Sequence, residues 1–252
     1  MKLPPGHRLV HFERIDSTNA EARRLAEAGE RGPLWLWAGE QTAGRGRLDR
    51  SWVSEPGNLY ATLLFSTVAP AAVAGQAGFA AAVAVHEVAQ RLLPDADIKL
   101  KWPNDVLIDG AKFCGLLAEI AGYTSNTMAL GCGINVASAP TGTPYPVTWL
   151  WRHGARTGVE TLLELLAESI WNWLTVWDEG RGFARIREAW LRRCAGLGRA
   201  ISLQSGNSST GGVFRGLAED GALILGLPGG RQRTIHAGDV RFAASGDPGG
   251  RV

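Results

Sequence analysis

The chain is poor in cysteine. Its 252 residues include only three, Cys114, Cys132 and Cys194, and no two of them form a C-x-x-C pair. A small, odd number of cysteines excludes a disulfide framework as the basis of the fold and is typical of a reduced compartment. We therefore expect a cytoplasmic protein.

A strong charge of one sign is also absent, because the formal net charge is +2. This argues against a protein that coats nucleic acid, although a local basic cluster could still bind a phosphate. The N-terminal segment MKLPPGHRLVHFERI has no apolar core of the kind that signal peptides carry. The most apolar stretch, residues 68–85, is rich in alanine and interrupted by Gly75, Gln76 and Gly78. We expect a buried helix there rather than a membrane span.

Several catalytic signatures are missing from the sequence. It has no G-x-S-x-G elbow, no Walker A loop, no zinc-like spacing of its five histidines, and no dinucleotide-binding G-x-G-x-x-G after a strand. Cys114 lies near Lys112 and is a candidate nucleophile, but it stands in an apolar segment, where a free cysteine usually packs as a small hydrophobe.

What the chain does contain is the pattern of an α+β domain. Two capping boxes, Thr18 with Glu21 and Thr157 with Glu160, predict helix starts, and Gly29 predicts the end of the first helix. Asp109-Gly110 predicts a tight hairpin. Predicted strands cover 8–15, 34–41, 58–66, 97–109, 111–122 and 126–137, and predicted helices cover 18–28, the alanine-rich run to about residue 93, 157–177 and 182–194.

After Gly198 the sequence changes to short apolar runs separated by glycine-rich turns, which predicts a small β-barrel. We therefore expect a larger, catalytic domain over residues 1–196, a small barrel over 197–244 and a disordered tail over 245–252.

The segment QTAGRGRLDRSW, residues 41–52, is called the arginine loop below. Gly44 and Gly46 allow the backbone to expose N–H groups, and Arg45, Arg47 and Arg50 add fork-shaped donors. Such a loop could close over a phosphate and stay mobile until one arrives. A solvated basic turn is an equal alternative from these residues alone.

The segment KWPNDVLID holds a second cluster, in which Pro103 interrupts strand pairing beside Asp105. An aspartate there could bind Mg²⁺, or it could cap a turn. Lys112 enters an apolar strand and needs an anionic partner, either a ligand or a salt bridge with Asp105 or Asp109.

The segment GCGINV holds a third cluster. Gly131 and Gly133 could admit a ligand or another backbone at close range, and Asn135 offers one amide in an apolar strand. A β-bulge followed by a turn-directed Asn would explain the same residues.

Taken in order, DSTN, GEQTAGRGRLDRSW, KWPNDVLI, KFCGLLAEI and GCGINV resemble the biotin protein ligase family. The resemblance implies a class II aminoacyl-tRNA synthetase-like domain, shared with lipoate ligases, and a C-terminal SH3-like barrel. It also implies the reaction: ATP and biotin form biotinyl-5′-AMP with Mg²⁺, and the biotinyl group then passes to a lysine of a biotin carboxyl carrier domain.

The resemblance further implies the roles of individual residues. Arg47 and Lys112 would be catalytic, and Asp105 would bind the metal. Biotin would contact Ser17, Thr18, Asn19, Gln41, Arg45, Gly46, Arg47, Lys112 and Gly115. ATP and the adenylate would contact Arg47, Arg50, Trp52, Lys112 and Asn135.

The chain departs from the family pattern in two places. Many relatives read GRGRRGR where this chain reads GRGRLDR, so Asp49 stands in place of a glycine and lowers the local positive charge. Some members place a tryptophan for adenine where this chain has Val147, so Trp52 is the expected adenine platform.

No helix-turn-helix precedes Arg8, which favours a ligase without a repressor role, and we expect no DNA or membrane partner and a possible homodimer. The alternatives are a lipoate or octanoate ligase, a non-catalytic biotin- or nucleotide-binding protein, and a nucleic-acid-binding protein that uses its barrel.

Overall fold

A computed structural model describes residues 1–122, 127–205 and 208–242. The tail from Ser245, for which we expected disorder, lies outside the described residues. The larger part consists of β1 (Arg8–Ile15), α1 (Thr18–Glu27), β2 (Leu34–Gln41), β3 (Leu59–Ser66), α2 (Ala71–Ala74), α3 (Ala77–Leu92), β4 (Ile98–Lys101), β5 (Asp105–Ile108), β6 (Ala111–Ala121), β7 (Thr127–Ile134), α4 (Val159–Trp177) and α5 (Phe183–Arg193). The smaller part consists of β8 (Ala200–Ser205), β9 (Ser208–Leu217), β10 (Leu223–Gly226), β11 (Gln232–Ile235) and β12 (Asp239–Phe242).

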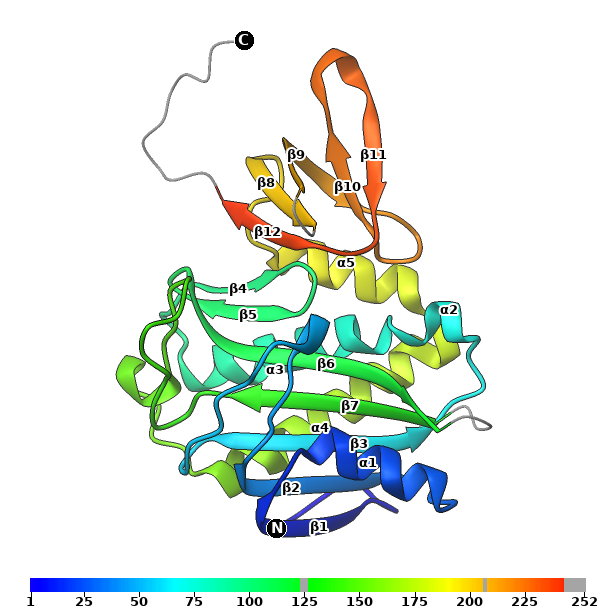
Figure 1. Ribbon diagram of the computed structural model, residues 1–252, viewed down its shortest axis with the longest axis vertical. Coiled ribbons are helices and arrows are strands. Elements are labelled where there is room, and N and C mark those ends of the chain that lie inside the picture. Colours follow the sequence, from blue (N-terminus) through cyan, green and yellow to red (C-terminus); the bar gives the residue numbers. More distant parts are fainter. Residues whose placement is uncertain (123–126, 206–207, 243–252) are drawn as a thin grey trace.

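A seven-stranded sheet with the order β1-β2-β3-β7-β6-β5-β4 forms the larger part. The β1–β2 pair is parallel and the other neighbours are antiparallel. Helices α3 and α4 cover one face of the sheet, whereas α1 lies on the other (Figure 1). β3 is therefore covered on both sides, which explains why its sequence, LYATLLFS, is buried at every position except the last. The predicted α+β class is confirmed.

The smaller part is an antiparallel sheet of order β11-β10-β9-β8-β12, which packs above β4 and α5 (Figure 1). Its buried residues, including Phe214 and Leu225, belong to the same hydrophobic core as the helices of the larger part. The indole N–H of Trp102 donates to the Gly221 carbonyl at 3.1 Å across this boundary. The two parts therefore share one core.

The alanine-rich run forms two helices, because Gly75 and Gln76 separate α2 from α3. By length and composition alone, Ala71–Leu92 could cross a membrane, but 61% of its most apolar window is buried inside the protein. The side chain of alanine is only a methyl group, so α3 can lie close against both α4 and the sheet. This is the buried helix that the sequence predicted.

Both predicted capping boxes are wrong. Ser17, one residue before Thr18, is the N-cap of α1, and its side chain accepts from the Ala20 N–H. The N-cap of α4 is Gly158, which makes no side-chain cap bond, while the Thr157 hydroxyl donates to the Gly158 carbonyl. The shift in α1 has a consequence for the site, because it leaves the Thr18 hydroxyl free for other partners.

The predicted turn signals are confirmed. Gly29 follows the C-cap of α1 with a φ of 101°. Asp109 and Gly110 join β5 to β6 with φ values of 50° and 79°, as a tight two-residue hairpin requires.

The environment of His86, on α3, predicts a pH dependence of stability. Burial, reinforced by Arg193, lowers the pKa of His86 from 6.5 to about 4. A lowered folded-state pKa means that the unfolded chain binds the proton more readily, so this contribution to stability is complete above pH 6.5 and is lost as the pH falls towards 4.

Wild type should lose free energy of unfolding between pH 6.5 and 4, and we expect this loss to be smaller by about 1–2 kcal/mol in the His86→Gln variant, a value reduced for solvent screening. Chemical denaturation across that range measures it. The exposed His236, changed to Gln, is the control. Parallel pH profiles for wild type and His86→Gln would contradict the prediction.

Candidate active site

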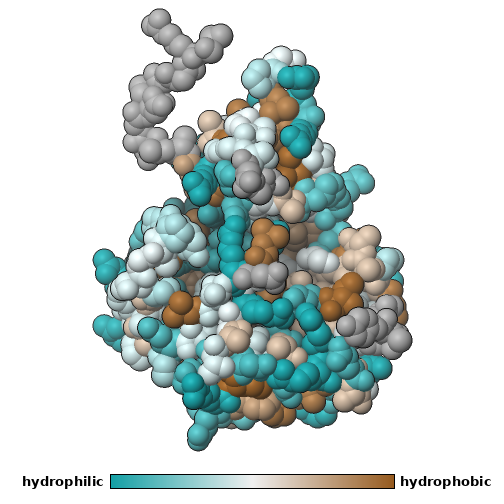
Figure 2. All heavy atoms as spheres, viewed as in Figure 1, coloured by the Kyte–Doolittle hydropathy of each residue, from teal (hydrophilic) through white to brown (hydrophobic). Residues whose placement is uncertain are grey.

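A cavity of about 710 Å³ opens between the sheet, the arginine loop and β12. Its size is in the range of small-molecule sites. Hydrophilic residues gather across the centre of this face of the molecule, below the smaller sheet (Figure 2). The structure brings most of the predicted residues into the lining of this one cavity: Ser17, Thr18, Asn19, Gln41, Arg45, Gly46, Arg47, Arg50, Trp52, Asp105, Lys112 and Gly115.

One end of the cavity is polar but uncharged, and α1 builds it. The backbone N–H of Thr18 donates to Gln41 Oε1 at 2.9 Å, and the Thr18 hydroxyl lies 3.1 Å from the same oxygen. Gln41 Nε2 in turn donates to Ser54 Oγ at 3.0 Å. Because Ser17 caps the helix, Thr18 stands in the first turn of α1, and its hydrogen bond to Gln41 holds that turn at the neutral end of the cavity. A neutral ligand group with hydrogen-bonding atoms fits here.

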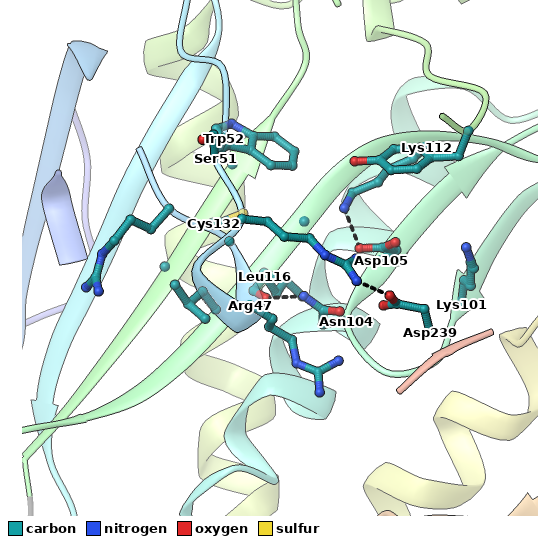
Figure 3. Close-up of a pocket in the computed structure, with 18 of the residues that line it drawn as sticks. Arg47, Ser51, Trp52, Lys101, Asn104, Asp105, Lys112, Leu116, Cys132 and Asp239 are labelled. Atoms are coloured by element: carbon teal, nitrogen blue, oxygen red, sulfur yellow. Dashed lines mark hydrogen bonds and ion pairs between the residues drawn. The ribbon is translucent and has the colours of Figure 1, made fainter. Parts of the chain in front are cut away.

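Lys112 occupies the middle of the cavity. Its Nζ lies 2.7 Å from Asp105 Oδ1, and the two side chains are only 14% and 18% exposed (Figure 3). The ammonium also lies over the rings of Trp52 and Tyr145, 5.2 and 5.5 Å from their centroids. Of the partners that the sequence left open, Asp105 is therefore the one found, whereas Asp109 lies 3.4 Å from His153.

The arginine loop folds back on itself. Trp52 N–H donates to the Gly44 carbonyl at 2.9 Å, and Gly46 N–H donates to the Arg50 carbonyl at 2.7 Å. Leu48 adopts a left-handed conformation at the tip, with φ 55°, and is 67% exposed. The side chain of Asp49 lies outside the described parts of the chain.

The three arginines of this loop face different partners. Arg50 forms an ion pair with Asp239 of β12, and Arg45 lies 3.6 Å from Glu119 of β6. Burial lowers the pKa of the Arg47 guanidinium, although Asp239 and Asp105 favour its charge. An arginine remains protonated near neutral pH even so. Arg47 is thus a desolvated cation in the cavity.

Two glycines form a flat floor under Trp52. Gly115 on β6 and Gly133 on β7 are directly opposite each other in the sheet. A Cβ on either would lie within 2.8 Å of the indole ring. Sequence analysis predicted that a ligand or another backbone comes close to the glycines of β7. In the structure the side chain of Trp52 occupies that position at Gly133. Gly131 plays the same part for Asn19, whose Oδ1 would lie 2.2 Å from an added Cβ.

The lining residues that sequence analysis missed include four with charged or aromatic side chains: Lys101, Tyr145, Asp239 and Arg241. Burial lowers the pKa of Lys101, and among the described residues no carboxylate lies within ion-pair distance of its ammonium. Lys101 is the first residue of the KWPND segment, so its position within a recognised motif was the available signal. Asp239 and Arg241 come from β12 and gave no such signal.

Asn135 is not brought into the cavity. It is 3% exposed, and its Nδ2 donates to the Thr148 carbonyl at 3.0 Å. Its contact with a nucleotide stays a prediction. The described residues contain no cluster of three or more His, Cys, Asp and Glu that could hold a metal ion.

Cys114 is fully buried, with its Sγ 4.0 Å from that of Cys132. Burial raises the pKa of the Cys114 thiol well above its ordinary value. A protonated thiol is a poor nucleophile, so the cysteine packs as a small hydrophobe.

The chain matches two family profiles. The profile described as "Biotin/lipoate A/B protein ligase family" matches residues 11–135, and that described as "Biotin protein ligase C terminal domain" matches residues 196–242. Both matches fall on the parts of the chain that line the cavity.

Individual relatives agree with these profiles. The chain is 41% identical to a biotin–[acetyl-CoA-carboxylase] ligase of Paracoccus denitrificans, over 91% of this chain and 98% of that protein. It is 31% identical to a ligase of the same name from Mycobacterium tuberculosis, over 89% and 85%. It is also similar to the structure of a biotin protein ligase from Aquifex aeolicus in complex with biotin and ATP, with 26% identity, a TM-score of 0.77 and coverage of 94% and 99%.

The Arg50–Asp239 ion pair predicts how the arginine loop is held. It joins the loop to the smaller sheet at a partly exposed position, where such pairs contribute up to about 1 kcal/mol. We expect Asp239→Asn to speed tryptic cleavage at Arg45, Arg47 or Arg50 in the ligand-free protein about threefold. Mass spectrometry of the fragments measures the rate.

The matched control for this experiment is Asp220→Asn, which removes a carboxylate that pairs with His236 elsewhere in the smaller part. Equal cleavage rates in wild type and Asp239→Asn, or the same acceleration in the control, would show that the ion pair does not hold the loop.

Proposed function

The chain belongs to the biotin protein ligase family, and we propose that its cavity binds biotin and ATP side by side for the ligase reaction. The enzyme activates biotin as biotinyl-5′-AMP, releases pyrophosphate and transfers the biotinyl group to a lysine of a biotin carboxyl carrier domain. One observation carries the proposal: a neutral polar end at α1 and a cationic end at Arg47 and Lys101 share one cavity, with Lys112 between them.

The neutral end suits the ring system of biotin. Ser17, Thr18, Asn19 and Gln41 offer several hydrogen-bonding atoms without net charge, and a ureido group has both N–H donors and a carbonyl acceptor. Biotin placed there would extend its acyl chain along the cavity towards Lys112, with its carboxylate near the ammonium, because Trp52 itself covers the glycine floor. Arg45, Gly46 and Gly115 line the cavity along this path.

The cationic end suits the phosphates of ATP. Arg47, Arg50 and Lys101 come from two different segments and are joined there by Arg241 of β12. Lys101 is well suited to meet a phosphate, because a desolvated ammonium without a carboxylate partner gains most from an incoming anion. The exposed ring of Tyr145 and the indole of Trp52 flank Lys112 from two sides. Tyr145 therefore joins Trp52 as a candidate platform for adenine.

The chemical step needs charge neutralisation and alignment. An oxygen of the biotin carboxylate forms a bond to the α-phosphorus of ATP, and the bond from that phosphorus to the bridging oxygen breaks as pyrophosphate leaves. Two anions approach each other, so Lys112 and Arg47 lower the barrier by holding both. No side chain forms a covalent bond, which agrees with the raised pKa of Cys114.

Transfer is the second step. The ε-amino group of the carrier lysine attacks the carbonyl carbon of the mixed anhydride, AMP leaves, and the nitrogen loses a proton. The anhydride is also open to attack by water, so a loop that covers it protects it until the carrier arrives. We propose the arginine loop for this role, because its residues line the cavity.

We propose Mg²⁺ as the metal and Asp105 as its protein ligand. Mg²⁺ usually keeps several waters and binds one or two carboxylates together with substrate phosphates, so a single aspartate beside the phosphate end fits. Asp105 would have to share its carboxylate with Lys112. The metal would neutralise phosphate charge.

A cytoplasmic location is proposed on the three free cysteines. The acceptor is proposed to be a carrier domain of a carboxylase, after the relatives named for acetyl-CoA carboxylase. A homodimer and the absence of DNA binding stay predictions.

The proposal is tested by pyrophosphate release from ATP with purified protein. Release that depends on biotin, followed by labelling of a carrier lysine, is expected. Release with lipoate or octanoate in place of biotin would assign the chain to the sister ligases. Tight biotin binding with no adenylate formed would make it a binding protein.

Lys112→Ala is expected to lower the rate of adenylate formation at least about 100-fold, because it removes the cation between the two reacting anions. Single-turnover formation of biotinyl-5′-AMP measures the rate. The control is Lys99→Ala on β4, the edge strand of the same sheet, where Lys99 pairs with Asp97 in a solvent-exposed ion pair. Near-normal turnover in a folded Lys112→Ala variant would remove this residue from the site.

Arg47→Gly is expected to let biotinyl-5′-AMP escape, because the loop loses its desolvated cation and its hold on the adenylate. The measurable result is biotin on lysines of an unrelated protein added to the reaction. If the variant labels only the carrier, the account of loop closure is wrong.

A further inference from the structure

Thr62 lies in the middle of β3, beneath the neutral end of the cavity, and is completely buried. It is not one of the residues that line the cavity. Its Oγ lies 2.8 Å from the Thr18 hydroxyl and 2.7 Å from Asn19 Oδ1. Opposite Thr62 on β7 is Gly131, whose missing side chain leaves the room that Asn19 occupies.

The amide groups at both ends of this cluster have fixed orientations. Asn19 Nδ2 donates to Glu119 Oε2 at 2.8 Å and to the Leu117 carbonyl at 3.3 Å, so Oδ1 must face Thr62. At the other end Gln41 Oε1 accepts the Thr18 backbone N–H, while Nε2 donates to Ser54. An acceptor oxygen therefore stands at each end, with two hydroxyl groups between them.

This arrangement is one hydrogen short. The four oxygens make three contacts: Asn19 to Thr62, Thr62 to Thr18, and Thr18 to Gln41, at 2.7, 2.8 and 3.1 Å. Two hydroxyl groups supply two hydrogens. One contact must therefore bring two oxygens together without a hydrogen between them.

The distances indicate which contact lacks the hydrogen. Two oxygens without a hydrogen between them repel, so the longest contact, at 3.1 Å, is the one that tolerates it. Gln41 Oε1 also keeps the backbone N–H of Thr18 as a donor. The Thr62 hydroxyl then donates to Asn19, and the Thr18 hydroxyl donates to Thr62.

We propose that Thr62 determines the specificity of the neutral end by accepting the hydrogen bond that the Thr18 hydroxyl donates. With its hydrogen directed away from the cavity, Thr18 presents only lone pairs to a ligand. The pocket therefore selects an N–H donor at this point and rejects an oxygen of the same size. The assignment of the ligand as biotin rests on the proposed function, but the polarity of Thr18 follows from the cluster.

The test uses equilibrium binding by calorimetry to the full-length protein. Its ligands are biotin and the two cyclic carbamates in which one ureido N–H is replaced by oxygen. Wild type is expected to bind biotin much more tightly than at least one carbamate. In Thr62→Val the Thr18 hydroxyl can turn its hydrogen into the cavity, so this ratio should fall about tenfold, the equivalent of about 1.4 kcal/mol.

Thr62→Ser keeps a hydroxyl at the same place and should retain the wild-type ratio. The matched control is Thr67→Val, which removes a buried hydroxyl that donates to Glu179 outside the cavity. It should destabilise the protein without changing the ratio.

An unchanged ratio in Thr62→Val would overturn the proposal. So would a Thr62→Ser variant that behaves like Thr62→Val, since packing and not the hydroxyl would then be responsible, or an equal fall in Thr67→Val. Failure of the proposed function looks different: wild type would then release no pyrophosphate with biotin, or would not bind it at all.

Discussion

The pairing of β6 with β7 is the constraint on which the site depends. Its register places Gly115 opposite Gly133, which makes the floor for Trp52, and places Leu117 opposite Gly131, which makes room for Asn19. A slip of one residue would turn every side chain of one strand to the other face. The floor of the cavity and the buried core on the opposite face would be lost together, so packing in the core protects the geometry of the site.

The cavity concentrates positively charged side chains, although the net charge of the whole chain is only +2. Among its cations, Lys112 is paired with Asp105, whereas Arg47 and Lys101 are desolvated. Removing a cation from water is costly, and the cost is lowest when an anion takes the place of the water. An anionic ligand therefore gains affinity from the unfavourable state of the ligand-free site.

The sequence predicted the strands and the main helices, and most of the site residues that it predicted do line the cavity, because these depend on local patterns and short motifs. It failed at both capping boxes, because Ser17 and not Thr18 caps α1, and α4 begins after Gly158 without a side-chain cap bond. It also missed Lys101, Tyr145 and Asp239. Lys101 had a signal in the KWPND motif, but Asp239 reaches the cavity only through the packing of segments far apart in the chain, as when Arg50 meets Asp239, 189 positions away. No local pattern encodes such a meeting.

The contribution of β12 to the cavity has an evolutionary consequence. Asp239 and Arg241 belong to β12, and no residue of the other strands of the smaller sheet, β8 to β11, is among the described residues that line the cavity. Substitutions in β12 could alter how the arginine loop is held while leaving every residue of the neutral end unchanged. The mobility of the loop and the choice of ligand at the neutral end could therefore diverge independently among descendants of one ancestor, because different segments of the gene encode them.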